Sequence, residues 1–503
     1  MNYCFPRPSL FSASLLVASV VLLFSLLLQT SMDTPISTST SGDVQQPQPQ
    51  RNMATSANAL KNVVVVGGSY VGKAAAKELA NILPPTHRVI LIEPHTHFHH
   101  LFAFPRFAIL PSHEHKAFIP YTSLFSSSPS PSSHLILPAK VLSVSTSPNT
   151  LTLDRPVQYP PSSVNTPISS SLNNAIGTTK QIPFDYLITA TGTRLSPPGS
   201  SPHDTKPLSI SFLQSFQSAI TSPSTSHVII VGGGAVGIQM ACDLKELHPG
   251  PTKKVTLVHS RDQLMPLYHH RLSDIVKVRF GELGVEMVLG KRAVVPVGGW
   301  ALPVPGQEGK KKKMVVNLAG GETVEGDVII QATGQQPNNE FLVGLETQQQ
   351  QQGTEEKGNG RVINPINGFV RVKKTMQFAD ERFSNFMFAV GDIADSGAHK
   401  AARPGSVQAA VAARNVVRLI EHEGKTSEEE DVELELESIE VQPAGIHLTL
   451  GLTKNIIFRN PNPAVGQMEP TYTLKDDGKE DMGIEGVWGR NGIKVSGPQE
   501  YHL

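Results

Sequence analysis

The first candidate site for chemistry is a glycine-rich segment, residues 67–72, with the sequence Gly-Gly-Ser-Tyr-Val-Gly. Residues 63–66 before it are all valine, which is typical of a parallel strand buried on both faces. Residues 73–81 after it are rich in alanine and predict a helix, and residues 88–92 predict a second strand, followed by Glu93. This order of strand, glycine-rich turn, helix and strand ending in an acid is typical of a dinucleotide-binding unit.

Each position of this unit has an expected physical role. Gly67, Gly68 and Gly72 let the backbone approach a pyrophosphate, whose negative charge is favoured by the helix N-terminus. We expect Glu93 to accept hydrogen bonds from the hydroxyls of an adenosine ribose. Ser69 stands where the usual pattern has glycine. Because serine is small, we expect the turn to survive with the hydroxyl near a phosphate.

A second segment, residues 232–237 with the sequence Gly-Gly-Gly-Ala-Val-Gly, matches the dinucleotide-binding pattern completely. Residues 228–231 predict the strand before it, and residues 238–247 predict the helix after it. Residues 255–258 predict the next strand. The same supersecondary unit therefore occurs twice.

The second unit differs from the first in the residue after its second strand, which is His259 and not an acid. We expect Gly232, Gly234 and Gly237 to bind the pyrophosphate of a nicotinamide dinucleotide. A carboxylate in place of His259 would favour the free 2′-hydroxyl of NADH. Its absence, with Arg261 nearby, permits the 2′-phosphate of NADPH. NADH and NADPH are both candidate donors.

A single glycine-rich turn is weak evidence, because such turns occur in many α/β proteins. Two copies in the same strand and helix context imply one site for FAD and one for NADH or NADPH. The two cysteines, Cys4 and Cys242, form no Cys-x-x-Cys pair. A redox-active dithiol is therefore absent, and electrons must leave a flavin directly.

Three further motifs follow in order along the chain. Two are Ala-Thr-Gly triplets after apolar runs and one is a Gly-Asp pair; the residues of interest are Thr191, Gly192, Gly334, Gly391 and Asp392. With these motifs the chain resembles the two-dinucleotide-binding-domain flavoproteins of the pyridine nucleotide-disulfide oxidoreductase superfamily. The resemblance implies that Gly334 contacts the nicotinamide dinucleotide and that the other four contact FAD.

Within that superfamily the chain is most similar to apoptosis-inducing-factor-like proteins of the ferroptosis suppressor type, including fungal members. The similarity rests on residues 255–260, on Phe98-His99-His100, and on Lys400 shortly after the Gly-Asp pair. It implies an oxidoreductase that takes hydride from NAD(P)H onto FAD and reduces a quinone-like acceptor, with Lys400 as the candidate catalytic residue. Relatives often have glutamate at Gln239, and a neutral amide cannot form an ion pair with Lys400.

The acceptor site is the least defined part of this hypothesis. A loop contains Phe102, Phe104 and Phe107, which either pack the FAD-binding domain or line an apolar slot beside the flavin. In the second interpretation a quinone headgroup stacks there while Lys400 stabilises its developing negative charge. The four histidines of residues 95–100 have no accompanying cysteine, so we interpret them as polar lining and predict no metal site.

Two other functions stay open. One is a respiratory enzyme similar to type II NADH dehydrogenases, and the other is a signalling flavoprotein with slow turnover, similar to apoptosis-inducing factor. Basic and acidic residues number 43 each, so the formal net charge is zero and gives no general attraction to nucleic acid. The sequence does not indicate the oligomeric state.

The elements that position these motifs predict an α/β fold with two Rossmann-like dinucleotide-binding domains, the NAD(P)H-binding domain inserted in the FAD-binding domain. We predict the FAD-binding domain at residues 60–195 and 336–425 and the NAD(P)H-binding domain at residues 196–335. Residues 426–503 are predicted to form a C-terminal α+β segment. Residues 1–59 are predicted to hold a hydrophobic anchor and a flexible linker.

The predicted anchor is residues 10–28, which are almost all apolar or serine and long enough to span a bilayer as a helix. A cleaved signal peptide and a buried segment are the alternatives. We therefore predict a membrane-anchored protein, at a mitochondrial membrane or another endomembrane. The linker then lets the catalytic domains reach a lipid-soluble acceptor.

Overall fold

The computed structural model describes residues 60–160, 177–303, 313–350, 361–425 and 434–503. The predicted anchor at residues 10–28 lies outside these ranges. Among the described residues, no helix has the length and apolar character needed to cross a membrane. The described residues all belong to one compact unit.

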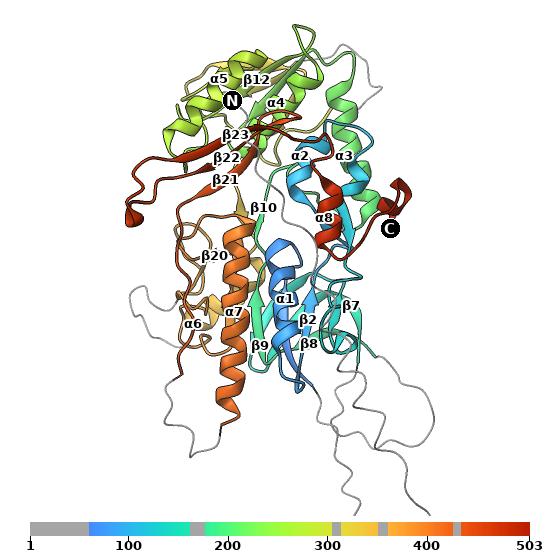
Figure 1. Cartoon of the computed structure of the whole chain (residues 1–503), viewed down its shortest axis with the longest axis vertical. Helices are drawn as coiled ribbons and strands as arrows, with labels where there is room; N and C mark the ends of the chain where they lie inside the picture. The colour runs from blue at the N-terminus through green and yellow to red at the C-terminus, as the bar shows by residue number, and fades with distance from the viewer. Residues whose placement is uncertain (1–59, 161–176, 304–312, 351–360, 426–433) are drawn as a thin grey trace, which may run out of the picture. The chain divides into compact units, whose positions relative to one another are not determined.

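The first part of this unit is built on a five-stranded parallel sheet with the strand order β19-β9-β1-β2-β5. Strand β1 (Lys61–Val66) lies at its centre, and its valines are buried because both faces of the sheet are covered. Helices α1 (Tyr70–Ile82) and α7 (Ala402–Glu423) lie side by side, and their alanines allow a close approach (Figure 1). The other strands are β2 (His87–Ile92), β5 (Leu135–Leu137), β9 (Tyr186–Thr189) and β19 (Met387–Ala389).

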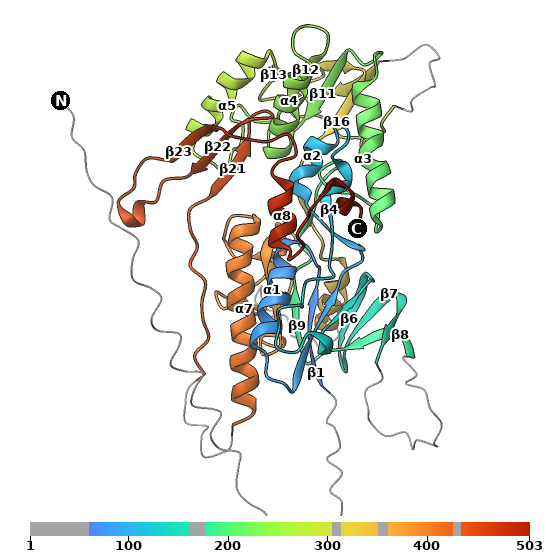
Figure 2. The same cartoon turned by 45° about the vertical axis from the view of Figure 1, so that its right-hand side comes forward.

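A second parallel sheet has four strands in the order β13-β12-β11-β16. One of its two inner strands, β11 (His227–Val231), leads through the second glycine-rich turn into helix α4 (Ala235–Leu247) (Figure 2). The other elements of this part are α3 (Lys206–Thr221), β12 (Lys254–Val258), α5 (His270–Leu283), β13 (Glu286–Val288), β14 (Met314–Asn317), β15 (Thr323–Gly326) and β16 (Val328–Gln331).

Two short segments connect the sheets. Strand β10 (Thr193–Arg194) leaves the first part and β17 (Gln336–Pro337) returns to it, and the two pair in antiparallel fashion. Because the second sheet lies between them in the chain, it is an insertion within the first part. The predicted α/β class with two Rossmann-like units is therefore confirmed. The exact domain boundaries at residues 195, 335 and 425 stay predictions.

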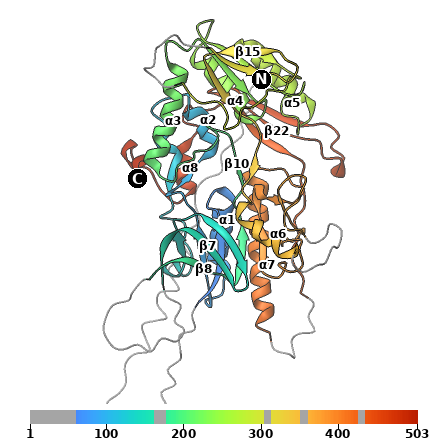
Figure 3. The ribbon, with the colours of Figure 1, turned by 180° about the vertical axis from the view of Figure 1, so that it is seen from behind.

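The C-terminal segment contributes a three-stranded antiparallel sheet, formed by β21 (Gly445–Thr449), β22 (Lys454–Arg459) and β23 (Thr471–Asp476). Its apolar residues, among them Ile456, join the same core as Met240 of α4. Figure 3 shows β22 next to α4. The chain then forms helix α8 (Ile484–Arg490). The segment is thus a mixture of α and β structure, as predicted.

Smaller elements complete the part of the chain that the structure describes. They are β3 (His97–His99), α2 (Phe104–Phe107), β4 (Phe118–Pro120), β6 (Val141–Thr146), β7 (Asn149–Tyr159), β8 (Gly177–Pro183), α6 (Val343–Gln350), β18 (Val370–Arg371) and β20 (Ala394–Asp395). Strands β6, β7 and β8 form an antiparallel sheet of their own.

The helices begin earlier than the sequence pattern predicts. Helix α1 begins at Tyr70 and α4 at Ala235, before the predicted starts at residues 73 and 238. The pattern assigned the end of each glycine-rich segment to the turn, but that end belongs to the first helical turn. Each helix N-terminus therefore lies directly at the glycine-rich backbone.

Candidate functional site

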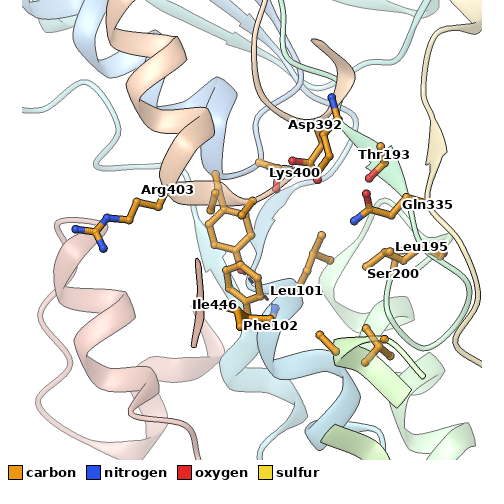
Figure 4. A pocket seen from close by; sticks show the side chains of 18 of the residues that line it. Leu101, Phe102, Thr193, Leu195, Ser200, Gln335, Asp392, Lys400, Arg403 and Ile446 are labelled. Atoms are coloured by element: carbon orange, nitrogen blue, oxygen red, sulfur yellow. Dashed lines mark hydrogen bonds between the residues drawn. The ribbon is translucent and has the colours of Figure 1, made fainter. Parts of the chain in front are cut away.

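One cavity of about 2470 Å³ is lined by both glycine-rich turns, by the start of α7 and by the C-terminal segment. We call it the central cavity. Figure 4 shows Asp392 and Lys400 close together on its wall, while Leu101, Phe102 and Ile446 form a more apolar part of the lining. The two dinucleotide-binding units therefore share one space.

The first position of each glycine-rich turn can accommodate only glycine, because a Cβ atom there would collide with the backbone of a neighbouring strand end. Gly67 has a φ of +98°, and a Cβ atom there would lie 2.6 Å from the carbonyl oxygen of Ala190. Gly232 has a φ of +129°, and a Cβ atom there would lie 2.2 Å from the carbonyl oxygen of Ala332. Each turn thus keeps bare backbone at the cavity wall, where a phosphate can approach closely.

Glu93 is buried directly after β2, beside the first turn. Its Oε2 atom accepts a hydrogen bond from the backbone N–H of Gly68. Its Oε1 atom accepts one from the backbone N–H of His95 at 3.0 Å and also contacts Nδ1 of that ring. Burial opposes protonation of His95, but the hydrogen bond and charge of Glu93 outweigh it and raise the pKa of His95. Glu93 is thus a fixed acceptor at the cavity.

His259 occupies the corresponding place in the second unit. Its Nδ1 atom accepts a hydrogen bond from the backbone N–H of Gly233 at 3.1 Å. Burial lowers the pKa of His259, and Arg261 acts in the same direction, against a hydrogen bond with the backbone of Gln263. A neutral imidazole therefore stands where the first unit has a carboxylate.

Two arginines line the cavity near His259. Arg261 follows β12 and Arg292 follows β13, and both are exposed. The backbone N–H of Lys291 donates to the carbonyl oxygen of His259 at 3.0 Å, so the two loops lie side by side. Arg292 could not be predicted from the dinucleotide-binding motif, because its loop follows a different strand from the one in the motif. The pair offers guanidinium donors suited to a phosphate.

Three helices begin at the cavity without a capping side chain. The N-cap residues are Ser69 for α1, Gly234 for α4 and Ala401 for α7, and none makes a side-chain capping hydrogen bond. All three line the cavity. Uncapped N–H groups and the helix dipole favour negative charge at these points. The described residues therefore fit two pyrophosphate groups and the electron-rich end of a flavin.

Asp392 and Lys400 are two charged residues that line the cavity in the segment before α7. Burial raises the pKa of Asp392, although Lys400 and a hydrogen bond with Thr193 oppose the shift. The Nζ atom of Lys400 donates to the carbonyl oxygen of Ala394 and lies 4.1 Å from the ring centre of Phe369. Burial lowers the pKa of Lys400, while the charge of Asp392 opposes the shift.

The other predicted contacts have two kinds of position. Thr191, Gly192 and Gly334 line the cavity, and Oγ1 of Thr191 donates to the carbonyl oxygen of Asn338 at 2.7 Å. Four predicted glycines lie behind the cavity surface, where they shape the backbone: Gly68, Gly72, Gly237 and Gly391. Contacts of all these residues with a cofactor stay predictions.

The two interpretations of the phenylalanine-rich loop apply to different residues. Phe104 and Phe107 are fully buried in the core beside α4. Phe102 is 53% exposed and lines the cavity. Its ring lies 4.9 Å from that of Tyr70, whose hydroxyl is hydrogen-bonded to Nδ1 of His100 at 2.9 Å. Of the three phenylalanines in this loop, only Phe102 is therefore available as apolar lining.

The histidines of residues 95–100 are also divided. His95, His99 and His100 line the cavity, whereas His97 lies outside its wall and is hydrogen-bonded to the backbone oxygen of Leu503 at 3.1 Å. In the described ranges, no group of three or more His, Cys, Asp or Glu side chains is placed to hold a metal ion.

Gln239 lies on α4 at the cavity wall, and its side chain contacts Met482 and Asp243. Its Nε2 atom lies 3.7 Å from the sulfur of Met482, and its side chain is hydrogen-bonded to Asp243. The neutral amide thus connects α4 to the C-terminal segment.

Asp243 in turn pairs with a buried arginine. The guanidinium of Arg106 makes two hydrogen bonds of 2.9 Å to Asp243 and three more, of 2.7 to 3.1 Å, to the carbonyl oxygens of Gly451, Leu452 and Lys479. Both charged side chains are almost completely buried. Arg106 therefore fixes α2, α4 and the C-terminal segment to one another.

Comparison with known proteins identifies the family. Residues 61–413 match the family model described as pyridine nucleotide-disulphide oxidoreductase. The chain belongs to this family. The match spans both glycine-rich turns and the Gly-Asp motif, so the resemblance predicted from these motifs is confirmed.

Relatives extend over most of the chain. It is 29% identical to Fe-regulated protein 8 of Mycosarcoma maydis, over 88% of this chain and 98% of the relative. It is 23% identical to apoptosis-inducing factor homolog B of Dictyostelium discoideum, over 82% of this chain and 91% of the relative. It is 25% identical to ferroptosis suppressor protein 1 of Mus musculus, over 71% of this chain and 80% of the relative.

Solved structures share the fold. Reduced Bacillus anthracis CoADR-RHD and an NAD-dependent persulfide reductase from A. fulgidus each superpose with a TM-score of 0.53 at 16% identity. The alignments cover 81% and 80% of this chain, and 62% and 64% of those chains. This chain thus spans less than two thirds of their length, and the likeness shows the fold alone.

Family membership defines the general chemistry. The protein is a flavoprotein oxidoreductase that uses FAD and NAD(P)H as cofactors. The predicted cofactors are thereby confirmed, while the acceptor and the choice between NADH and NADPH are separate questions.

Proposed function

We propose that this oxidoreductase passes electrons from NAD(P)H, through FAD, to a quinone-like acceptor. The observation that carries the proposal is the exposed ring of Phe102 in the same cavity as Lys400 and the start of α7. FAD supplies the two-electron store between donor and acceptor. Because the sequence contains no Cys-x-x-Cys motif to carry electrons away from the flavin, we expect the acceptor itself to enter the central cavity.

The lining of the cavity suits such an acceptor. Leu101, Phe102 and Ile446 offer apolar surface for a quinone ring, and offset stacking on Phe102 adds a specific contact. Lys400 supplies a positive charge for the oxygen on which negative charge develops. Partial burial strengthens that interaction, because the local dielectric constant is lower than in water.

The donor site is expected to accept NADPH at least as well as NADH. With His259 neutral and already bonded to Gly233, the second unit has no carboxylate at that position for the free ribose hydroxyls. Arg261 and Arg292 are both exposed at the cavity, where a 2′-phosphate would meet them.

The same proposal includes a membrane location. The apolar stretch at residues 10–28 is long enough to hold the enzyme at a bilayer, where hydrophobic quinones dissolve. A mitochondrial membrane or another endomembrane would meet this requirement equally.

The test compares acceptors. Oxidation of NAD(P)H is measured with a short-chain ubiquinone analogue, ferricyanide and oxygen, in the wild type, Lys400→Met and the control Lys374→Met, which changes an exposed lysine. We expect quinone to be reduced faster than oxygen, and only Lys400→Met to lose the quinone reaction selectively. Quinone turnover no faster than with oxygen would contradict the proposal and favour a signalling flavoprotein. A strong preference for a protein carrier would favour a different respiratory reductase.

A further inference from the structure

A short hydrogen bond crosses between the two nucleotide-binding parts of the protein. The phenol oxygen of Tyr268 lies 2.6 Å from Nε2 of His399, and their rings meet edge to face with centroids 5.3 Å apart. Tyr268 follows β12 in the inserted part, and His399 precedes α7 in the other part. Both residues line the central cavity, and neither has a role in the chemistry described above.

The loop that ends at Tyr268 begins at the donor site. Residues 259–268 include His259 and Arg261, and the backbone N–H of Met265 donates to the carbonyl oxygen of Gly233 at 3.0 Å. Met265 has a φ of +50°, which a residue with a side chain adopts only where its surroundings hold it. The loop therefore has a fixed path from the second glycine-rich turn to Tyr268.

Tyr268 is held from both sides by Asn460 of the C-terminal segment. Nδ2 of Asn460 donates to the carbonyl oxygen of Leu267 at 3.1 Å, and its Oδ1 accepts from the backbone N–H of His269 at 2.8 Å. Tyr268 itself is only 6% exposed. Its backbone is therefore fixed on both sides and its ring is buried, so the phenol has a defined position relative to the donor loop.

His399 is the direct neighbour of Lys400. The amino group of Lys400 is held by the carbonyl oxygen of Ala394 and by the face of Phe369, and its side chain extends from the backbone directly after His399. A side chain that fixes His399 therefore restrains the backbone from which Lys400 extends. The chain of contacts runs from the donor loop through Tyr268 and His399 to Lys400.

We propose that the Tyr268–His399 hydrogen bond couples occupancy of the donor site to the position of Lys400. Tyr268 and His399 are then positioning residues for the acceptor half of the reaction. This inference rests on the proposed function, since it assigns Lys400 to the acceptor. Any coupling of this kind requires that donor binding changes the free energy of the contact.

Tyr268→Phe tests the coupling, because it removes the hydroxyl and keeps the ring. Rapid-mixing measurements would follow flavin reduction by NADPH and, separately, flavin reoxidation by a short-chain ubiquinone analogue. We expect reduction within about twofold of the wild type and reoxidation slowed by about tenfold, the size expected for one lost hydrogen bond. Equal slowing of both steps, or no change in either, would overturn the proposal.

Two further variants separate coupling from a loss of structure. Tyr472→Phe removes the hydroxyl of a tyrosine that is 39% exposed and bonded to Arg271, and it should leave both steps unchanged. His399→Gln keeps a hydrogen-bonding side chain, whereas His399→Leu does not. We expect His399→Gln to retain most of the reoxidation rate and His399→Leu to behave like Tyr268→Phe. The reverse order would contradict the proposal.

A spectral measurement tests the coupling without any acceptor. NADP⁺ binds without donating electrons, so its effect on the absorbance of oxidised flavin reports contact between the two sites. Because coupling is reciprocal, we expect Tyr268→Phe to bind NADP⁺ with a changed affinity and to lose most of this spectral change. If wild-type flavin is not reoxidised by quinone, the proposed function fails while this result still decides the coupling. A spectral change equal to that of the wild type would overturn it.

Discussion

The backbone N–H of Gly233 donates to Nδ1 of His259 across 3.1 Å, in the same place where the first unit has Gly68 bonded to Glu93. A neutral ring and a carboxylate thus perform the same local task, which is to hold the glycine-rich turn against the end of the neighbouring strand. The two groups differ in how they can bind a ligand. Only the carboxylate carries a full negative charge with which to accept hydrogen bonds from ribose hydroxyls.

This arrangement makes the stability of the second unit sensitive to acid. Because burial lowers the pKa of His259, the unfolded chain binds this proton more readily than the folded protein. The free energy of unfolding should therefore decrease as the pH falls from about 7 to about 5, through the usual histidine value. His259→Asn keeps an acceptor for Gly233 but does not titrate, so its urea-unfolding free energy should depend less on pH. Identical pH dependence in both proteins would contradict this role.

The two cavity arginines predict the donor preference. Arg261→Ala and Arg292→Ala should each lower kcat/KM for NADPH by about tenfold to a hundredfold, the range expected when a charged hydrogen bond is lost. The value for NADH should change by no more than about threefold, since NADH has no 2′-phosphate. Arg271→Ala, in helix α5 and away from the cavity lining, serves as the control. Equal losses with both donors would show that the arginines do not bind the 2′-phosphate.

The buried pair of Arg106 and Asp243 predicts a large loss of stability. Arg106→Ala leaves a buried carboxylate without its ion-pair partner and removes the arginine donor from three carbonyl oxygens, so urea unfolding should show a loss of about 3–5 kcal/mol. Arg155→Ala removes an exposed ion-pairing arginine and should cost no more than about 1 kcal/mol. A similar small cost for Arg106→Ala would show that the pair does not hold the three parts together.

The predicted anchor is tested by truncation. Full-length protein should fractionate with membranes, and removal of residues 1–50 should release a soluble enzyme that retains its activity with a water-soluble quinone analogue. Recovery of the full-length protein in the soluble fraction, or its secretion in trimmed form, would contradict the prediction.

The sequence predicts the parts of this fold that depend on neighbouring residues. The valines of β1, the turn at Gly67 and the alanines of α1 lie within one short stretch, so their pattern is visible without any tertiary contact. The same holds for the second unit. The resemblance to the family further predicts that the NAD(P)H-binding domain is inserted in the FAD-binding domain. It also predicts the role of the Gly391-Asp392 pair.

Contacts between distant residues were beyond the sequence analysis. Tyr268 and His399 are 131 positions apart, and Arg106 and Asp243 are 137 apart. Neither pair belongs to a motif, because each depends on how loops from different sheets meet. Phe104 and Phe107 show the same difficulty, since the spacing that predicts an apolar loop does not distinguish core packing from cavity lining.

The most direct measurement is an anaerobic titration of the purified protein with NADPH and then with a quinone. The absorbance of the flavin is recorded after each addition. NADPH should bleach the flavin band, and a short-chain ubiquinone analogue added afterwards should restore it before any oxygen is admitted. A protein that binds no FAD, a band that NADPH and NADH both leave unchanged, or a bleached band that only oxygen restores would contradict electron transfer from NAD(P)H to a quinone.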